Sequence, residues 1–132
     1  MPSFEVRTGR LVVFVDITAE VVAQVDASGL TDGVVVVYVP HTTAGVTINE
    51  NADPSVRADL EMALERLVPS SLPFTHLEGN GDAHVKASLM GSSVTIPLQG
   101  GRLQLGTWQG VYFAEFDGPR RRRVVVTVLA AG

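Results

Sequence analysis

The sequence predicts one α+β domain over residues 1–132, built mostly from antiparallel β-sheet in a sandwich-like arrangement, with one long helix and one or two short helices. Three observations predict this fold. Short runs rich in β-branched residues recur between turn residues, which is typical of strands. One segment, which begins at Asp53, has apolar residues at helical spacing. The length and the 45% apolar content are those of a single domain with its own core.

The N-terminal segment is predicted to form two strands and a short helix. Residues 4–8 and 11–17 are the strands, and a tight turn joins them. Thr18 is a suitable N-cap for a helix over residues 19–27, whose valines recur at helical spacing. The order is therefore strand, turn, strand and helix.

The long helix follows two further strands. Residues 34–40 form a nearly continuous β-branched run, which predicts a strand buried on both faces, and residues 46–49 form a short strand. Asp53 and Pro54 are an N-cap and a first helical residue, so the helix is predicted over 54–68. Its predicted buried stripe consists of Val56, Leu60, Ala63, Leu64 and Leu67.

The second half of the chain is predicted to be a polar loop, a short helix and a series of strands. Residues 69–81 are rich in Pro, Gly and polar side chains, and a loop of this length is commonly functional. A short helix is predicted over 83–90. The predicted strands are 93–98, 102–105, 109–116 and 123–129.

Composition excludes several classes of protein. The net charge of −4 and the pI near 5.2 argue against a nucleic-acid-binding protein, and no apolar run is long enough to span a membrane. The absence of cysteine excludes disulfides and thiolate chemistry. Without a signal-peptide pattern, a cytoplasmic protein is expected. Only 18% of residues are charged, which indicates that copies of the chain bury apolar surface against one another.

The three histidines are the main candidates for chemistry. His41 follows the predicted buried strand, while His76 and His84 flank the polar loop. Asn49 and Glu50 lie shortly after His41 and supply an amide and a carboxylate. Three imidazoles and a carboxylate are the ligands of a catalytic zinc site, so a divalent metal is expected, with zinc favoured over magnesium. The alternative is three unrelated histidines, since no HExxH motif joins them.

A second group of residues is suited to binding a phosphorylated small molecule or an inorganic anion. Thr42 and Thr43, with the start of the helix at Asp53, offer hydroxyl and amide donors, although Asp53 itself is read as a plain cap. Asn80 lies in a Gly-Asn-Gly string that would let the backbone approach a ligand. Arg120 begins a run of four arginines, which either contacts phosphate or keeps an edge strand solvated.

Five motifs follow one another along the chain: His41-Thr42-Thr43-Ala44-Gly45, Ile48-Asn49-Glu50-Asn51, Gly79-Asn80-Gly81-Asp82-Ala83-His84, Leu105-Gly106-Thr107-Trp108-Gln109 and Glu115-Phe116-Asp117-Gly118-Pro119-Arg120. These motifs resemble the YjbQ-like family, and the resemblance extends from about Asp16 to Val128 without large insertions. Gly81 stands where the family pattern is expected to have a small residue such as alanine, which predicts a looser loop.

The resemblance implies a homotrimer with a histidine-lined pocket where subunits meet, and members are described as a secondary thiamine-phosphate synthase. That enzyme joins a pyrimidine diphosphate to a thiazole phosphate and releases pyrophosphate. The matching positions imply that His41, His76 and His84 line the pocket, with Asn49 and Glu50 beside them. Two mechanisms remain open. Either a metal neutralises the diphosphate leaving group, or the site is a zinc hydrolase or a non-catalytic metal- or anion-binding centre.

Overall fold

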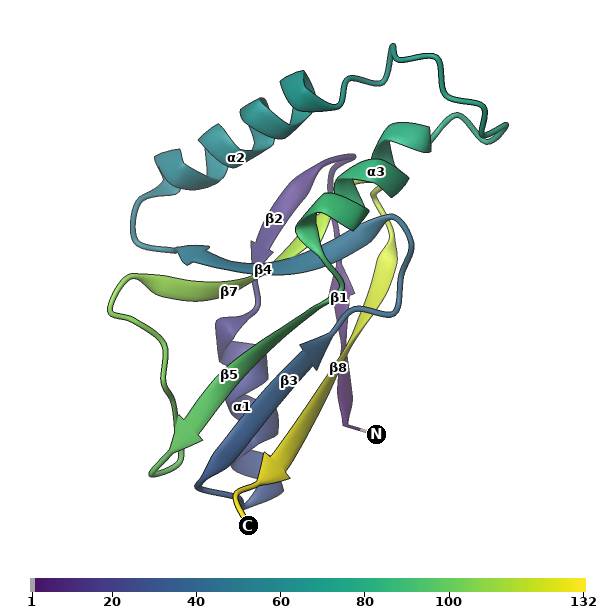
Figure 1. Ribbon diagram of the computed structural model, residues 1–132. Coiled ribbons are helices and arrows are strands. Elements are labelled where there is room, and N and C mark those ends of the chain that lie inside the picture. Colours follow the sequence, from purple (N-terminus) through teal and green to yellow (C-terminus); the bar gives the residue numbers. More distant parts are fainter. Residues whose placement is uncertain (1) are drawn as a thin grey trace.

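The structure is a computed structural model that describes residues 2–132, in which two antiparallel sheets and three helices form the fold (Figure 1). The larger sheet has the strand order β1-β8-β3-β5-β6, and the smaller has the order β2-β7-β4. The strands are β1 (Ser3–Arg7), β2 (Val13–Asp16), β3 (Gly33–Tyr38), β4 (Ala44–Glu50), β5 (Ser93–Gln99), β6 (Arg102–Leu103), β7 (Gln109–Glu115) and β8 (Arg121–Ala130). The helices are α1 (Thr18–Ser28), α2 (Pro54–Leu67) and α3 (Gly81–Met90). The predicted α+β class is confirmed.

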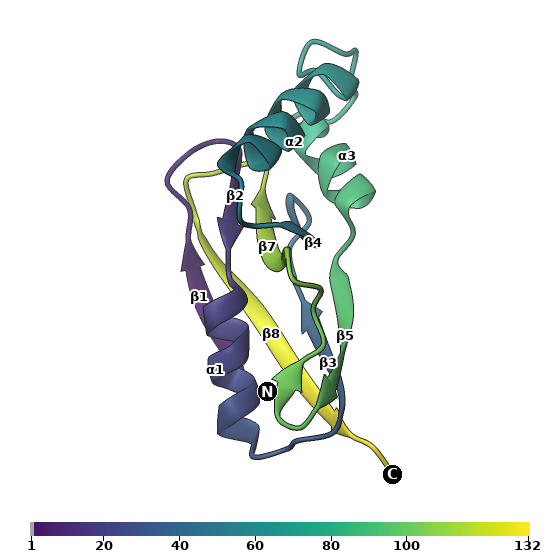
Figure 2. The same cartoon turned by 90° about the vertical axis from the view of Figure 1, so that its left-hand side faces the viewer.

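The smaller sheet forms the middle layer of the molecule. Side chains of a strand alternate between the two faces, and on β7 Phe113 packs into one core while Tyr112 and Ala114 pack into another. The first core lies between the two sheets and includes valines of α1. The second lies beneath α2 and α3, which cover the other face of the smaller sheet (Figure 2). β7 is therefore buried on both faces.

The two strands predicted at the N-terminus are present, and they lie in different sheets. β1 pairs with β8 of the larger sheet, and β2 pairs with β7 of the smaller one. The connection between them crosses from one sheet to the other. Thr18 lies inside α1 rather than capping it, and its backbone N–H donates to the side chain of Asp16 at 3.0 Å. The turn residues predict where one strand ends and the next begins, but they do not predict which strand each one pairs with.

The prediction for the long helix is confirmed at its start and wrong along its stripe. The Asp53 carboxylate accepts a hydrogen bond from Ser55 N–H at 2.9 Å, and Pro54 is the first helical residue. Within the helix only Leu64 is fully buried, whereas Ala63 and Leu67 are exposed. Val56 and Leu60 are half-buried, so only part of the predicted stripe meets the core.

The remaining predicted elements are present with small shifts of their ends. α3 begins at Gly81, two residues earlier than predicted, and β8 begins at Arg121. β8 lies between β1 and β3, so it is not an edge strand. β3 is buried on one face only, through Val35 and Val37. Among residues 2–132, no helix has the length and apolar content needed to cross a membrane.

Candidate functional site

Two of the three histidines lie against each other. The rings of His76 and His84 meet edge to face, with their centroids 4.9 Å apart. His84 lies in the first turn of α3, and His76 lies in the loop that precedes it. Both line a depression of about 290 Å³ together with Phe74, Thr75 and Gly81. The polar loop therefore folds back onto α3 and places one imidazole on the other.

Gly81 allows this contact between loop and helix. It is buried, and a Cβ at this position would lie 2.6 Å from Cγ of Phe74. That distance is shorter than any carbon–carbon contact between unbonded atoms, so a larger residue would displace Phe74 or the helix. Gly81 therefore packs the loop closely onto α3.

His41 lies across a groove from His84. This groove has a volume of about 470 Å³, and His41, Thr42 and Ala44 line one side, ahead of and at the start of β4. The other side is α3 and the residues after it, with His84 and the hydroxyl groups of Ser88 and Ser92. Because His84 also contacts His76, the structure brings the three predicted histidines to one region. We call this region the histidine groove.

Beside the histidine groove, β4 and the end of α3 meet through their main chains. The amide N–H of Val46 donates to the carbonyl of Gly91 at 3.1 Å, which joins β4 to the end of α3. A Cβ on Gly45 would lie 2.6 Å from the same oxygen. Glycine at position 45 is thus required for the helix end and the strand to approach so closely.

The imidazole of His41 is held by the backbone of β8. Its Nε2 accepts a hydrogen bond from the N–H of Arg123 at 2.9 Å. Partial burial, and then the nearby positive charge of Arg122, lower the pKa of His41 below its ordinary value. Neutral imidazole is therefore favoured at pH 7.

A buried network lies behind His41. The guanidinium of Arg122 binds both carboxylate oxygens of Glu115 and also donates to Oγ1 of Thr43 at 2.9 Å. Glu115 accepts a further hydrogen bond from Oγ1 of Thr8 at 2.7 Å. Burial raises the pKa of Glu115, but the hydrogen bonds from Arg122 and Thr8 outweigh it and hold that pKa below its usual range. Glu115 is consequently a buried carboxylate with its charge satisfied.

Asn49 and Glu50 do not join the histidines within one chain. They form the last two residues of β4, whereas His41 precedes its first residue, Ala44. From Ala44 to Asn49 the strand rises about 17 Å at about 3.3 Å per residue. The Asn49 side chain accepts a hydrogen bond from Glu50 N–H, and the Glu50 carbonyl accepts one from Tyr112. The helix start at Asp53 lies at this same distant end, so it forms no common anion site with Thr42.

The other predicted binding residues have mixed positions. Thr42 is exposed and lines the histidine groove, but Thr43 is committed to Arg122. Arg120 is bound to Asp117, through the carbonyl at 2.8 Å and the carboxylate at 3.1 Å. Asn80 donates to the same carboxylate at 2.9 Å, and its Oδ1 is buried without a partner. Only Thr42 of this set faces the groove directly.

The residues of one chain do not form a three-ligand metal centre. Across residues 2–132, no three His, Cys, Asp or Glu side chains gather closely enough to hold a metal ion. His76 and His84 supply two imidazoles, and Glu78 lies 3.9 Å from His76. Nε2 of His41 is already used by Arg123. The expected zinc site thus stays a prediction that needs ligands beyond this arrangement.

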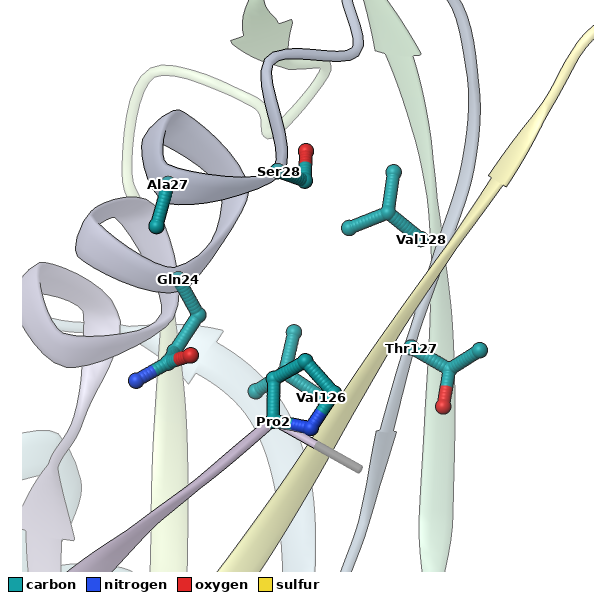
Figure 3. A pocket seen from close by; sticks show the side chains of 7 residues that line it. All are labelled: Pro2, Gln24, Ala27, Ser28, Val126, Thr127 and Val128. Carbon is teal, nitrogen blue, oxygen red and sulfur yellow. The ribbon is translucent and has the colours of Figure 1, made fainter.

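Another cavity, which no histidine lines, lies between α1 and β8 (Figure 3). It has a volume of about 230 Å³, and Val126 and Val128 point from β8 toward the helix. Its other lining residues are Pro2, Gln24, Ala27, Ser28 and Thr127. None of these side chains is titratable at neutral pH, so this cavity, unlike the histidine groove, offers no acid–base group.

Glu115 and Arg122 are the residues that sequence reasoning missed. Glu115 ends an apolar run in β7, and a carboxylate in such a run must have a buried partner. Arg122 belongs to the run of arginines that is predicted either to contact phosphate or to keep an edge strand solvated, and strand alternation separates it from Arg121 and Arg123. An acidic residue on β7 and a basic residue on β8 were the signal in the sequence from which this buried pair could have been predicted.

The fold and groove define a class of small α+β proteins with two antiparallel sheets and a histidine-lined groove at the end of one sheet. The model of the UPF0047 protein YjbQ-like family matches residues 2–131, and the chain belongs to this family. The UPF0047 protein MJ1081 of Methanocaldococcus jannaschii is 52% identical over 96% of this chain and 91% of its own. The UPF0047 protein YugU of Bacillus subtilis is 43% identical over 98% of each chain.

Solved structures confirm the fold. A protein of Clostridium acetobutylicum, described as an uncharacterized conserved protein of the same family, superposes with a TM-score of 0.96 at 51% identity, covering 98% of this chain and 100% of that one. A hypothetical protein of Aeropyrum pernix gives a TM-score of 0.94 at 40% identity, with 98% of each chain covered. The descriptions of these proteins state no activity.

Proposed function

We propose that the chain is a transferase of the thiamine-phosphate synthase type, which binds its diphosphate substrate in the histidine groove. The observation that carries this proposal is the shared position of His41 and His84 on opposite sides of one groove. His76 extends the imidazole surface on the far side of His84. A pocket with several hydrogen-bond donors suits the oxygens of a phosphate or diphosphate.

The reaction needs stabilisation of negative charge on the departing pyrophosphate. The bond between the pyrimidine methylene carbon and the diphosphate oxygen breaks, the thiazole nitrogen forms the new bond to that carbon, and pyrophosphate leaves. Imidazole N–H groups and the hydroxyls of Thr42, Ser88 and Ser92 are the donors along the groove. Arg123 adds positive charge beside His41, whereas Arg120 is occupied by Asp117.

Calorimetry with pyrophosphate tests binding, and product formation from the two phosphorylated substrates with added Mg²⁺ tests the transfer. We expect His41→Ala, His76→Ala and His84→Ala each to reduce pyrophosphate affinity by at least about tenfold, because each removes a charged or polar contact. Gln24→Ala is the matched control, because Gln24 lines the cavity between α1 and β8, and this variant should retain affinity. Wild-type affinity in all three histidine variants would contradict the proposal.

The contact between His76 and His84 favours a second function, a zinc-binding centre that is hydrolytic or non-catalytic. Two adjacent imidazoles are half of a tetrahedral zinc site, and Glu78 is near enough to assist as base or as a hydrogen-bond partner of His76. Metal analysis of protein purified without chelator separates the two functions. Stoichiometric zinc that is lost in His76→Ala would favour this second function.

A further inference from the structure

Glu115 and Arg122 form an ion pair between the two sheets. Glu115 is at the end of β7 in the smaller sheet, and Arg122 is near the start of β8 in the larger one. The Glu115 side chain is fully buried and that of Arg122 is 6% exposed. Together with Thr8 and the N–H of Asp117, Arg122 satisfies both oxygens of the carboxylate. Such a closed network fixes the position of the guanidinium.

The fixed guanidinium reaches the segment that carries His41. Nη2 of Arg122 donates to Oγ1 of Thr43, two residues after His41. The next residue of β8, Arg123, donates its backbone N–H to Nε2 of His41. Adjacent residues of one strand therefore hold the His41–Thr43 segment at two points, one through a side chain and one through the backbone.

The hydrogen bond to Arg123 occurs where the sheet ladder ends. β3 pairs with β8 only over residues 125–130, so Arg123 lies beyond the paired part. His41 follows β3 after Pro40, and its ring nitrogen accepts the N–H that no β3 residue takes. The imidazole therefore accepts a hydrogen bond from the main chain, and this bond fixes the orientation of the ring.

The direction of this bond determines the tautomer. A nitrogen that accepts a hydrogen bond carries no hydrogen, so neutral His41 has its proton on Nδ1. Within residues 2–132, Nδ1 makes no hydrogen bond to the protein, and the ring lines the histidine groove. We propose that Glu115 and Arg122 are positioning residues, which hold His41 so that Nδ1–H donates to an oxygen of an anionic ligand in the groove. The anionic ligand, but not the positioning of His41, rests on the proposed function.

Nitrogen-15 NMR of the imidazole tests the positioning without reference to activity. We expect wild-type His41 to be the Nδ1–H tautomer, and we expect Arg122→Lys and Thr43→Val to give a mixture of tautomers. Thr43→Val keeps the Glu115–Arg122 pair and so avoids the loss of folding that Glu115→Ala risks. Ile96→Val, a core change in the larger sheet, is the matched control for loss of stability alone and retains the tautomer.

Pyrophosphate calorimetry on the same variants completes the test. A mixed tautomer and at least about a tenfold loss of affinity in Arg122→Lys, with both unchanged in Ile96→Val, would support the proposal. An Nε2–H tautomer in the wild type would overturn it, as would wild-type spectra and affinity in both Arg122→Lys and Thr43→Val. If the spectra change as expected but the wild type binds no pyrophosphate, the positioning role stands and the ligand class and proposed function fail.

Discussion

Nζ of Lys86 on α3 lies 2.8 Å from a carboxylate oxygen of Glu65 on α2, and this contact joins the two helices that cover the smaller sheet. Lys86 is the only lysine of the chain, and its side chain is 1% exposed. A second carboxylate, that of Asp82, lies 3.3 Å from the same nitrogen. An ammonium group enclosed in this way is not available as a nucleophile for Schiff-base chemistry.

Glu65→Gln is expected to destabilise the fold by about 2 kcal/mol, because it removes a charged hydrogen-bond partner from a buried ammonium while Asp82 remains. Urea unfolding measures the difference. Glu61→Gln is the control, since Glu61 pairs with the exposed Arg10 at 3.2 Å and a surface pair contributes about 0–1 kcal/mol. Equal losses in the two variants would mean that the burial of Lys86 has no energetic consequence.

Gly81→Ala should weaken pyrophosphate binding by displacing Phe74, which lines the depression beside His76 and His84. Its melting temperature should also fall, because the new Cβ contacts the root of the Phe74 side chain rather than a flexible end. Gly9→Ala is a matched control, since nothing lies within 4 Å of its added Cβ. If Gly81→Ala binds pyrophosphate like the wild type, Phe74 has no part in shaping the site.

Stability should fall at acid pH through Glu115. Its pKa in the folded protein is below the unfolded value of 4.5, so the folded state binds fewer protons than the unfolded state in this range. The contribution of Glu115 is complete above pH 4.5 and is lost as pH falls through the folded pKa. Urea unfolding at several pH values should show a shallower acid loss in Glu115→Gln than in the wild type. The pKa of Asp16 is also lowered, so part of the acid loss of stability should persist in this variant.

The cap of α2 provides a change that should affect stability alone. Asp53→Ala removes the acceptor for Ser55 N–H and should lower the melting temperature, whereas Asp53→Asn retains an acceptor and should lower it less. Both variants should bind pyrophosphate normally, because α2 begins at the end of β4 that is distant from His41. Loss of binding at an unchanged melting temperature would place Asp53 in the site.

Assembly into a homotrimer is the remaining prediction. Several large apolar side chains are exposed in the single chain, including Leu77 at 99%, Leu67 at 71% and Trp108 at 62%. The exposure of Trp108 excludes a core position, and we predict that it packs between subunits. Light scattering at micromolar concentration should give three times the 14.0 kDa mass of the chain. A monomer at that concentration would refute the trimer.

Local signals in the sequence were sufficient to predict the helices and strands. They were not sufficient to predict which strands pair over long distances in the chain. Asp53 and Pro54 specify a helix start by capping alone, so the prediction matches the structure there. The first strand is followed at once by a turn and a second strand, yet it pairs with β8 at the far end of the chain. Nothing in a short strand encodes its partner, because both faces and both edges are open to several alternatives.

The candidate site was predictable by residue type and only partly by position. The three histidines lie at a strand end or beside the polar loop, where sites are commonly built, so the three imidazoles could be grouped. Glu50 follows His41 closely in sequence. The extended strand β4 lies between them, however, so Glu50 is at the opposite end of β4 from His41. Proximity along an extended chain is a poor guide to proximity in space.

The close approach of β4 to the end of α3, beside the histidine groove, limits how this protein can acquire new specificity. Gly45 and Gly91 meet backbone to backbone, so position 45 is not free to take a side chain. Diversity can instead enter at Thr42, Ser88 and Ser92, whose side chains line the groove. A library randomised at these three positions would sample different ligands on an unchanged scaffold, whereas one that includes position 45 would consist largely of chains that cannot bring α3 onto β4.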